Sequence, residues 1–170
     1  TNVLTRGSSH PVREVDLIHH WEFNENSGDV ANDSVGTAHL NFTGTNGNQW
    51  RTCVLGNCAF FDGVDDEARV DVADTVTDFT VSLWVQANHS GQPRYSSAIA
   101  VNDVAGDDES FQIMTGGGSP GDWELYHNTS YNFGTVDPTV WQHLVATFLN
   151  DTVTLYLNGV EILNQTVPNG

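Results

Sequence analysis

The stretch FTVSLWV, residues 79–85, decides the fold class of this chain. Beginning at Phe79, every second residue is apolar, and a period of two places these side chains on one face of a β-strand. Trp84 falls on the opposite face, which predicts that this second face is also partly covered. The stretch is therefore a strand that lies in a packed sheet.

The rest of the chain shows the same alternation in short segments separated by polar turns. Further strands are expected at residues 17–23, 39–42, 59–61, 67–72, 97–101, 110–114, 123–127, 141–148, 152–157 and 160–163. Asn158-Gly159 is the pair that a type I′ hairpin turn favours. No segment keeps a helical apolar period, so the sequence predicts an all-β, antiparallel, two-sheet jelly-roll sandwich. Residues 1–16 lack periodicity and are expected to form an arm or linker.

Four blocks of residues, in this order, resemble one known family. They are WEFNENSG with NDS after it (residues 21–28 and 32–34), GN with AFFDGVDD (56–57 and 59–66), FTVSLWV (79–85), and WQHLVATF with LYLNG (141–148 and 155–159). Together they resemble the LamG-like jelly roll of the concanavalin A-like lectin/glucanase superfamily. The resemblance runs from Leu17 to Asn164, within one domain expected at residues 17–170. It implies the fold, but not one function, because this fold carries lectins, adhesins, enzymes and scaffolds.

The end of the chain departs from the family pattern. Members usually continue past the Asn-Gly hairpin with two more strands, the last of which pairs beside the first strand, whereas this chain stops at Gly170. The strand expected at residues 17–23 would then present an open edge. Three explanations stay open: the sequence is a fragment, residues 1–16 fold back onto the edge, or another chain donates the strand and thereby builds an assembly.

Charge is the strongest signal in the composition. The chain has 22 Asp and Glu against five basic residues, a net charge of −17, and no lysine. Such a surface stays hydrated in concentrated salt, where its self-repulsion is screened. We therefore expect a halophilic source, an archaeon or its virus. The same charge makes nucleic acid and anionic membranes poor partners, and no apolar stretch is long enough to insert into a membrane.

Cysteines and sequons indicate export. Cys53 and Cys58 are close enough in sequence to form a small disulfide ring, although two reduced thiols remain an alternative. Six Asn-x-Ser/Thr sequons are candidate N-glycosylation sites, at Asn32, Asn41, Asn88, Asn128, Asn150 and Asn164. A chain rich in Asn, Ser and Thr also produces sequons by chance. The compartment expected is extracellular: the cell surface, the medium or a virion.

Catalytic motifs are missing from the sequence. Glycosidases of the related glucanase branch carry Glu-x-Asp-x-x-Glu on a strand, and here the closest segment is EVDLIH, residues 14–19, which ends in histidine. Asp107-Asp108-Glu109 is contiguous, so its side chains diverge. No nucleophile elbow, phosphate loop or zinc-binding His-Glu-x-x-His is found. We expect a protein that is not an enzyme.

Calcium is the ligand that the acidic loops favour, because hard cations bind several oxygens on irregular loops. The resemblance implies a calcium site near the loop after the first strand, where Glu25, Asn32 and Asp33 lie. A second cluster is Asp62, Asp65 and Asp66. The Asp62-Gly63 turn can also be purely structural.

Carbohydrate binding needs an exposed aromatic ring that stacks on a sugar. Trp123 and Tyr131 are the candidates, with a core position as the alternative for both, while Trp21, Trp84 and Trp141 are expected to pack. The favoured hypothesis is an adhesion, recognition or assembly module that binds a glycan or a surface protein. The alternative is a carbohydrate-binding module of a secreted polysaccharide-degrading enzyme, and an active glycosidase or lyase is a third class.

Overall fold

A computed structural model describes residues 17–72, 78–87, 96–101, 111–116, 121–127 and 129–166. The described residues form thirteen strands and no helix, and every strand pairing is antiparallel. Among these residues there is no helix that could cross a membrane. Contacts divide the chain into two compact units, Thr1–Ala73 and Asp74–Gly170.

The first unit contains two small sheets. β1 (Val30–Ala31), β2 (Leu40–Thr43) and β5 (Glu67–Arg69) form one, in the order β1-β2-β5, and β3 (Trp50–Thr52) pairs with β4 (Asn57–Ala59) in the other. Phe42 is buried, and its ring packs against the rings of Trp50 and Phe61 at centroid distances of 5.2 and 5.6 Å. Aromatic packing therefore supplies much of the apolar burial in this unit.

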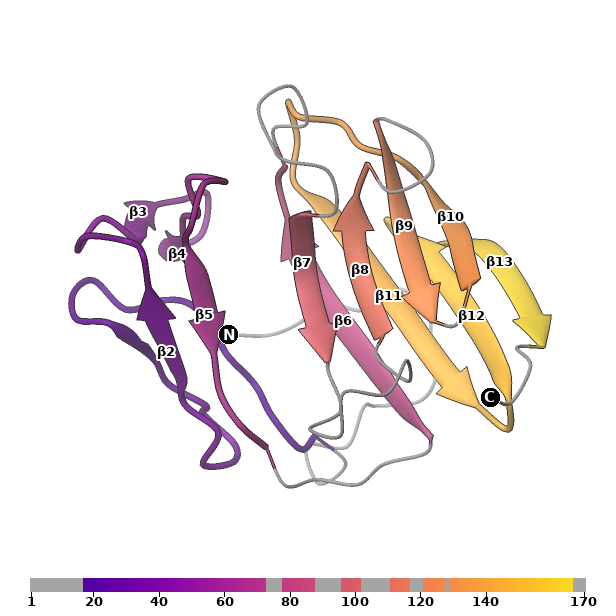
Figure 1. Cartoon of the computed structure of the whole chain (residues 1–170), viewed down its shortest axis with the longest axis horizontal. Helices are drawn as coiled ribbons and strands as arrows, with labels where there is room; N and C mark the ends of the chain where they lie inside the picture. Colours follow the sequence, from indigo (N-terminus) through magenta and orange to yellow (C-terminus); the bar gives the residue numbers. More distant parts are fainter. Residues whose placement is uncertain are drawn as a thin grey trace. The chain divides into compact units, whose positions relative to one another are not determined.

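The second unit contains two four-stranded sheets (Figure 1). The first has the order β13-β12-β11-β6 and is formed by β6 (Phe79–Val85), β11 (Gln142–Leu149), β12 (Thr152–Leu157) and β13 (Val160–Thr166). The second has the order β10-β9-β8-β7 and is formed by β7 (Ser96–Val101), β8 (Phe111–Thr115), β9 (Asp122–His127) and β10 (Thr129–Thr135).

One apolar core joins the two sheets of this unit. Its members alternate along the strands, as in β11, where every second residue from Gln142 to Phe148 is buried. Side chains from both sheets share the same cluster, among them Ile113, Trp123, Leu125, Phe133, Leu144, Val153 and Leu155, all fully buried. The fold is thus an all-β sandwich of antiparallel sheets, as the alternation predicts.

The strongest sequence predictions are confirmed. The strand expected at residues 79–85 is β6, with the same bounds, and the hairpin expected around Asn158-Gly159 is formed by β12 and β13. Asn158 and Gly159 have φ angles of 52° and 80°, the left-handed pair that a type I′ turn requires. The sequence analysis missed β10, although Tyr131 and Phe133 alternate along it and both are buried.

The strand expected at residues 17–23 is wrong. This segment makes only an isolated bridge between Trp21 and Asp33, and Phe23 has a φ of 52°, which an extended strand does not allow. The backbone N–H of His20 donates to the Asp33 carboxylate instead of to a strand partner. The open sheet edge was expected because this segment was taken as a strand, so that expectation no longer has a basis. The expected arm, residues 1–16, lies outside the described residues.

Candidate functional site

Among the described residues of the second unit, Trp84 is the aromatic side chain that most clearly faces solvent. It lies near the end of β6, and the alternation that turns Leu83 and Val85 toward the core turns Trp84 outward. Its exposed fraction is 64%. The sequence analysis expected Trp84 to pack, so this expectation is corrected: the outward face of β6 leaves most of the indole in water. A large exposed aromatic side chain of this kind is a common mark of a binding surface.

His143 holds the Trp84 ring in place from the neighbouring strand. The two residues are direct partners in the pairing of β6 with β11, and their rings stack at a centroid distance of 4.9 Å with an interplanar angle of 18°. One face of the indole is therefore covered by the imidazole, and the exposed remainder of the ring is open to a ligand. We refer to Trp84, His143 and Ser82 together as the indole platform.

The platform is fixed by hydrogen bonds behind the ring pair. The Nε2 atom of His143 lies 2.8 Å from the Ser82 hydroxyl, and the His143 backbone N–H donates to the Asn158 side-chain oxygen at 2.9 Å. Burial lowers the pKa of His143, so its ring is neutral at neutral pH. The result is an ordered, uncharged aromatic surface with a hydroxyl beside it, which suits stacking on the C–H face of a sugar.

The sugar-stacking candidates from the sequence, Trp123 and Tyr131, are both corrected to core residues. Trp123 is 0% exposed and Tyr131 is 6% exposed. The indole N–H of Trp123 donates to the Gln142 side-chain oxygen at 2.9 Å inside the sandwich. Neither ring can stack on a ligand, because Trp123 on β9 and Tyr131 on β10 both point into the core between the sheets.

Both carboxylate oxygens of Asp33, the first of the expected calcium ligands, are occupied by groups of the chain itself. Its Oδ1 accepts hydrogen bonds from the backbone N–H groups of His20, Val35 and Gly36, and its Oδ2 accepts from Ala38 and lies 2.6 Å from His19 Nδ1. Burial alone would raise the pKa of Asp33, but these hydrogen bonds outweigh it and hold the pKa far below its usual value. The carboxylate organises the loop around it.

The other two members of that site contact each other. The Glu25 Oε1 atom accepts hydrogen bonds from the backbone and side-chain nitrogens of Asn32, at 2.7 and 3.1 Å. This Glu25 oxygen thus holds the turn that leads into Asp33, whereas Glu25 Oε2 is buried without a hydrogen-bond partner among the described residues.

The second acidic cluster does come together. Asp62, Asp65 and Asp66 each offer a carboxylate oxygen, and these atoms lie within 4.8 Å of one another. The turn is ordered from within, because Val64 N–H donates to Asp62 Oδ1 and Asp62 N–H donates to Asp66 Oδ2, both at 2.8 Å. Three carboxylates at this spacing could hold a divalent cation.

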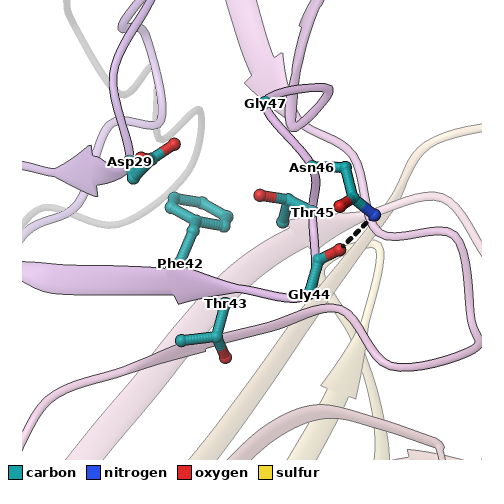
Figure 2. Close-up of a pocket in the computed structure, with 7 residues that line it drawn as sticks. All are labelled: Asp29, Phe42, Thr43, Gly44, Thr45, Asn46 and Gly47. Carbon is teal, nitrogen blue, oxygen red and sulfur yellow. Dashed lines mark hydrogen bonds between the residues drawn. The ribbon is translucent and has the colours of Figure 1, made fainter.

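A shallow hollow of about 220 Å³ lies beside β2 in the first unit, and the sequence analysis did not identify it. Figure 2 shows its seven lining residues, Asp29 and the run from Phe42 to Gly47. The Asn46 side-chain amide donates to the Gly44 carbonyl at 2.9 Å and closes the turn. The hollow offers mainly backbone and short polar groups, with no set of groups that points to a reaction.

The structure also places the two features that the sequence analysis linked to export, the cysteine pair and the sequons. Cys53 and Cys58 form a disulfide that closes the turn between β3 and β4, as the sequence indicated. Four sequon asparagines lie at exposed positions, Asn32, Asn41, Asn150 and Asn164. The sequons at Asn88 and Asn128 lie outside the described residues. Exposure is what N-glycosylation requires, so these four stay predictions that the structure permits.

Comparisons with known proteins agree with this architecture. One similar solved structure is domain 4 of AbnA, an extracellular GH43 arabinanase from Geobacillus stearothermophilus, in complex with arabinotriose. Its TM-score with this chain is 0.59, and the two sequences are 21% identical. The similarity covers 79% of this chain and 69% of that one, and at this identity it shows the fold alone. A comparison with curated proteins finds no match. A profile of the Laminin_G_3 family, described as the concanavalin A-like lectin/glucanases superfamily, matches residues 61–170. With well over half of its length matched, the chain belongs to this family.

Proposed function

We propose that this protein is a non-catalytic glycan-binding domain of an exported protein, of the kind attached to polysaccharide-degrading enzymes. The observation that carries the proposal is the indole platform, in which Trp84 is 64% exposed and is braced by a stacked His143. The structurally similar arabinanase domain was solved with arabinotriose bound, which supports a carbohydrate ligand for this fold. The disulfide between Cys53 and Cys58 fits an exported protein.

Preorganisation is the physical reason why this surface suits a sugar. A Trp side chain that already has one rotamer loses little conformational entropy when a ligand stacks on it. The stack on His143 and the contact of His143 with Ser82 fix that rotamer before binding. Sugar rings have C–H faces that match the indole and hydroxyls that match neighbouring polar groups.

Replacing Trp84 with Ala tests the proposal. We expect Trp84→Ala to weaken binding to a responsive glycan by about 2 kcal/mol, or about thirtyfold in Kd, because it removes the central aromatic contact. Isothermal titration and affinity electrophoresis against arabinan, xylan, β-glucan, galactan and mannan measure this. Thr80→Ala, on the same exposed face of β6, is the matched control and should bind like wild type. An unchanged affinity for Trp84→Ala would remove the platform from the binding site.

An adhesion or assembly role is a second candidate, and one feature favours it. β13 is at the edge of its sheet and exposes Val160 and Ile162, at 62% and 42%. Apolar groups on an edge strand favour pairing with another chain. Light scattering separates the two roles, because a glycan-binding module should stay monomeric at micromolar concentration, whereas an assembly protein should form oligomers that Ile162→Lys breaks.

We also propose a Ca²⁺ ion at Asp62, Asp65 and Asp66. At a Ca²⁺ concentration about 100 times its Kd, we expect stabilisation of about 2.7 kcal/mol. Thermal unfolding with Ca²⁺ and with EDTA measures it. Asp62→Asn with Asp65→Asn should abolish the difference, and Asp71→Asn, an exposed carboxylate in the same unit, should keep it. Equal melting temperatures in Ca²⁺ and EDTA for wild type would contradict the site.

The net charge of −17 leads to a proposal about salt. The family match and the arabinanase domain give no support for a brine organism, so the halophilic source is a prediction from charge alone. Lowering the ionic strength to about 0.01 M lengthens the Debye distance to about 30 Å, so repulsion among the carboxylates grows. We expect on the order of 2 kcal/mol less stability there than in about 1 M NaCl. Circular dichroism melts at both salts measure this, and identical curves would rule out a salt-dependent fold.

A further inference from the structure

A second tryptophan, Trp141, lies on the same face of the sheet as the indole platform. It directly precedes β11, and the first residue of that strand, Gln142, is buried and accepts a hydrogen bond from the Trp123 indole at 2.9 Å. Successive side chains of an extended chain point to opposite faces, so Trp141 and His143, on either side of Gln142, both point outward. Trp141 was expected to pack, but it is half-buried and does not belong to the core cluster that the described residues form.

The pairing of β6 with β11 places Trp141 diagonally from Trp84. Trp84 is the direct partner of His143, and Trp141 lies two positions before His143. Diagonal neighbours on one face of an antiparallel pair are roughly 7–8 Å apart, which is within reach of aromatic side chains. The two indoles therefore occupy neighbouring positions on the outer face of this sheet.

Gln86 lies beside both tryptophans. The last pair of the ladder is Val85 with Gln142, so Gln86 and Trp141 are one step beyond it. Gln86 is exposed, and its side-chain amide donates to the Pro138 carbonyl at 2.9 Å, which ties it to the loop that leads into Trp141. Two aromatic side chains with a held amide group next to them have the composition that a sugar site needs, because apolar faces bind the ring and a few fixed polar groups bind its hydroxyls.

We propose that Trp141 is a second sugar-stacking position, so that the site binds at least two consecutive sugars of a glycan chain. The inference rests on the proposed function and specifies the length of its ligand. Trp84, which is 64% exposed, contacts one sugar, and Trp141 contacts the next. Their diagonal separation of roughly 7–8 Å is wider than one sugar ring and suits two linked rings. A ligand that contacts both gains affinity from the second ring without a second loss of translational and rotational freedom.

Oligosaccharides of increasing length test the proposal in the full chain. They are prepared from the polysaccharide with the highest affinity in the panel described above, from the monosaccharide to the hexasaccharide, and calorimetric or NMR titration gives each Kd. For wild type we expect the affinity to rise about tenfold or more between the monosaccharide and the trisaccharide, because the longer ligand reaches the second ring. Trp84→Ala should weaken binding at every length.

Trp141→Ala separates the two positions. We expect it to weaken binding of the trisaccharide and longer ligands about tenfold, and to leave the monosaccharide within about twofold of wild type. Trp141→Phe keeps an aromatic face and should recover most of the gain with length. Val145→Ala is the matched control, since Val145 is half-buried and is the outward neighbour of His143 in the other direction along β11. Circular dichroism melts identify a temperature at which all variants are folded, and binding is compared there.

The outcomes separate the two levels of the proposal. Trp141 is overturned as the second position if Trp141→Ala keeps the length dependence of wild type, if it loses affinity equally at every length, or if Val145→Ala shows the loss instead. Equal affinity of wild type for all lengths has the same meaning. In each of these cases an impaired Trp84→Ala leaves the glycan-binding function standing. A panel without any binding, or binding that Trp84→Ala does not change, overturns the proposed function and the second position with it.

Discussion

Replacing Asp33 with Ala is expected to unfold the first unit locally and to lower its stability by about 4 kcal/mol. Asp33 is 5% exposed. Its carboxylate accepts hydrogen bonds from four backbone N–H groups and also contacts His19. Alanine would leave these partly buried donors without their acceptor, and each such loss is costly. Hydrogen exchange, followed by mass spectrometry on the full chain, should show lost protection across residues 17–45.

Asp71→Ala is the matched control, because it removes the same charge from the same unit. The Asp71 side chain is 86% exposed and lies 3.5 Å from Arg69, whose side chain is 75% exposed. Exposed ion pairs add little stability, so protection should stay as in wild type. If Asp33→Ala and Asp71→Ala gave the same exchange pattern, the Asp33 carboxylate would not be the group that holds this loop.

The pH dependence of this unit follows from the direction of the Asp33 pKa shift. The pKa is lower in the folded chain than in the unfolded chain, where aspartate has a value of about 3.9. The stability that the ionised carboxylate contributes is therefore complete above about pH 5 and is lost as the pH falls toward the folded pKa. Hydrogen-exchange protection near Asp33 should accordingly decrease in acid in wild type and change less in Asp33→Asn.

Replacing Trp123 with Ala is expected to destabilise the second unit by about 4 kcal/mol. Trp123 is fully buried between the sheets, and its indole N–H donates to Gln142. The variant would leave a large cavity and would remove a buried hydrogen bond. Urea unfolding measures the loss, and Trp123→Phe, which keeps most of the apolar volume, should recover part of it.

The same substitution at Trp84 gives the opposite pattern, which makes the two tryptophans controls for each other. Trp84→Ala should lose glycan affinity with little loss of stability, since its ring is 64% exposed. Trp123→Ala should lose stability, and its binding, measured at a temperature where it is folded, should be near wild type. If Trp123→Ala lost binding without losing stability, the assignment of Trp123 to the core would be contradicted, and Trp123 would be a ligand-binding residue.

Some of this molecule can be derived from sequence because the information is local. A period of two along β6 and β11 fixes which side chains share a face, and Asn158-Gly159 fixes the turn because few residues tolerate two left-handed conformations in succession. The disulfide between Cys53 and Cys58 is also local, since the turn between β3 and β4 brings the two together.

Other features depend on residues that are distant in sequence. Asp33 was assigned to calcium, but the chain folds residues 19 and 20 back onto its carboxylate, which satisfies both oxygens with hydrogen-bond donors. Trp84 and His143 are 59 positions apart in sequence and meet through the pairing of β6 with β11.

The sequence by itself determined an all-β family member with a strongly acidic surface, because alternation and composition are properties of neighbouring residues and of totals. Only the tertiary structure decided which tryptophan faces water, since periodicity assigns a side chain to one face of a strand but does not say what lies against that face. The core between the sheets covers Trp123, whereas His143 covers only one side of Trp84. Exposure is a property of the packed molecule, and the proposed glycan site depends on it.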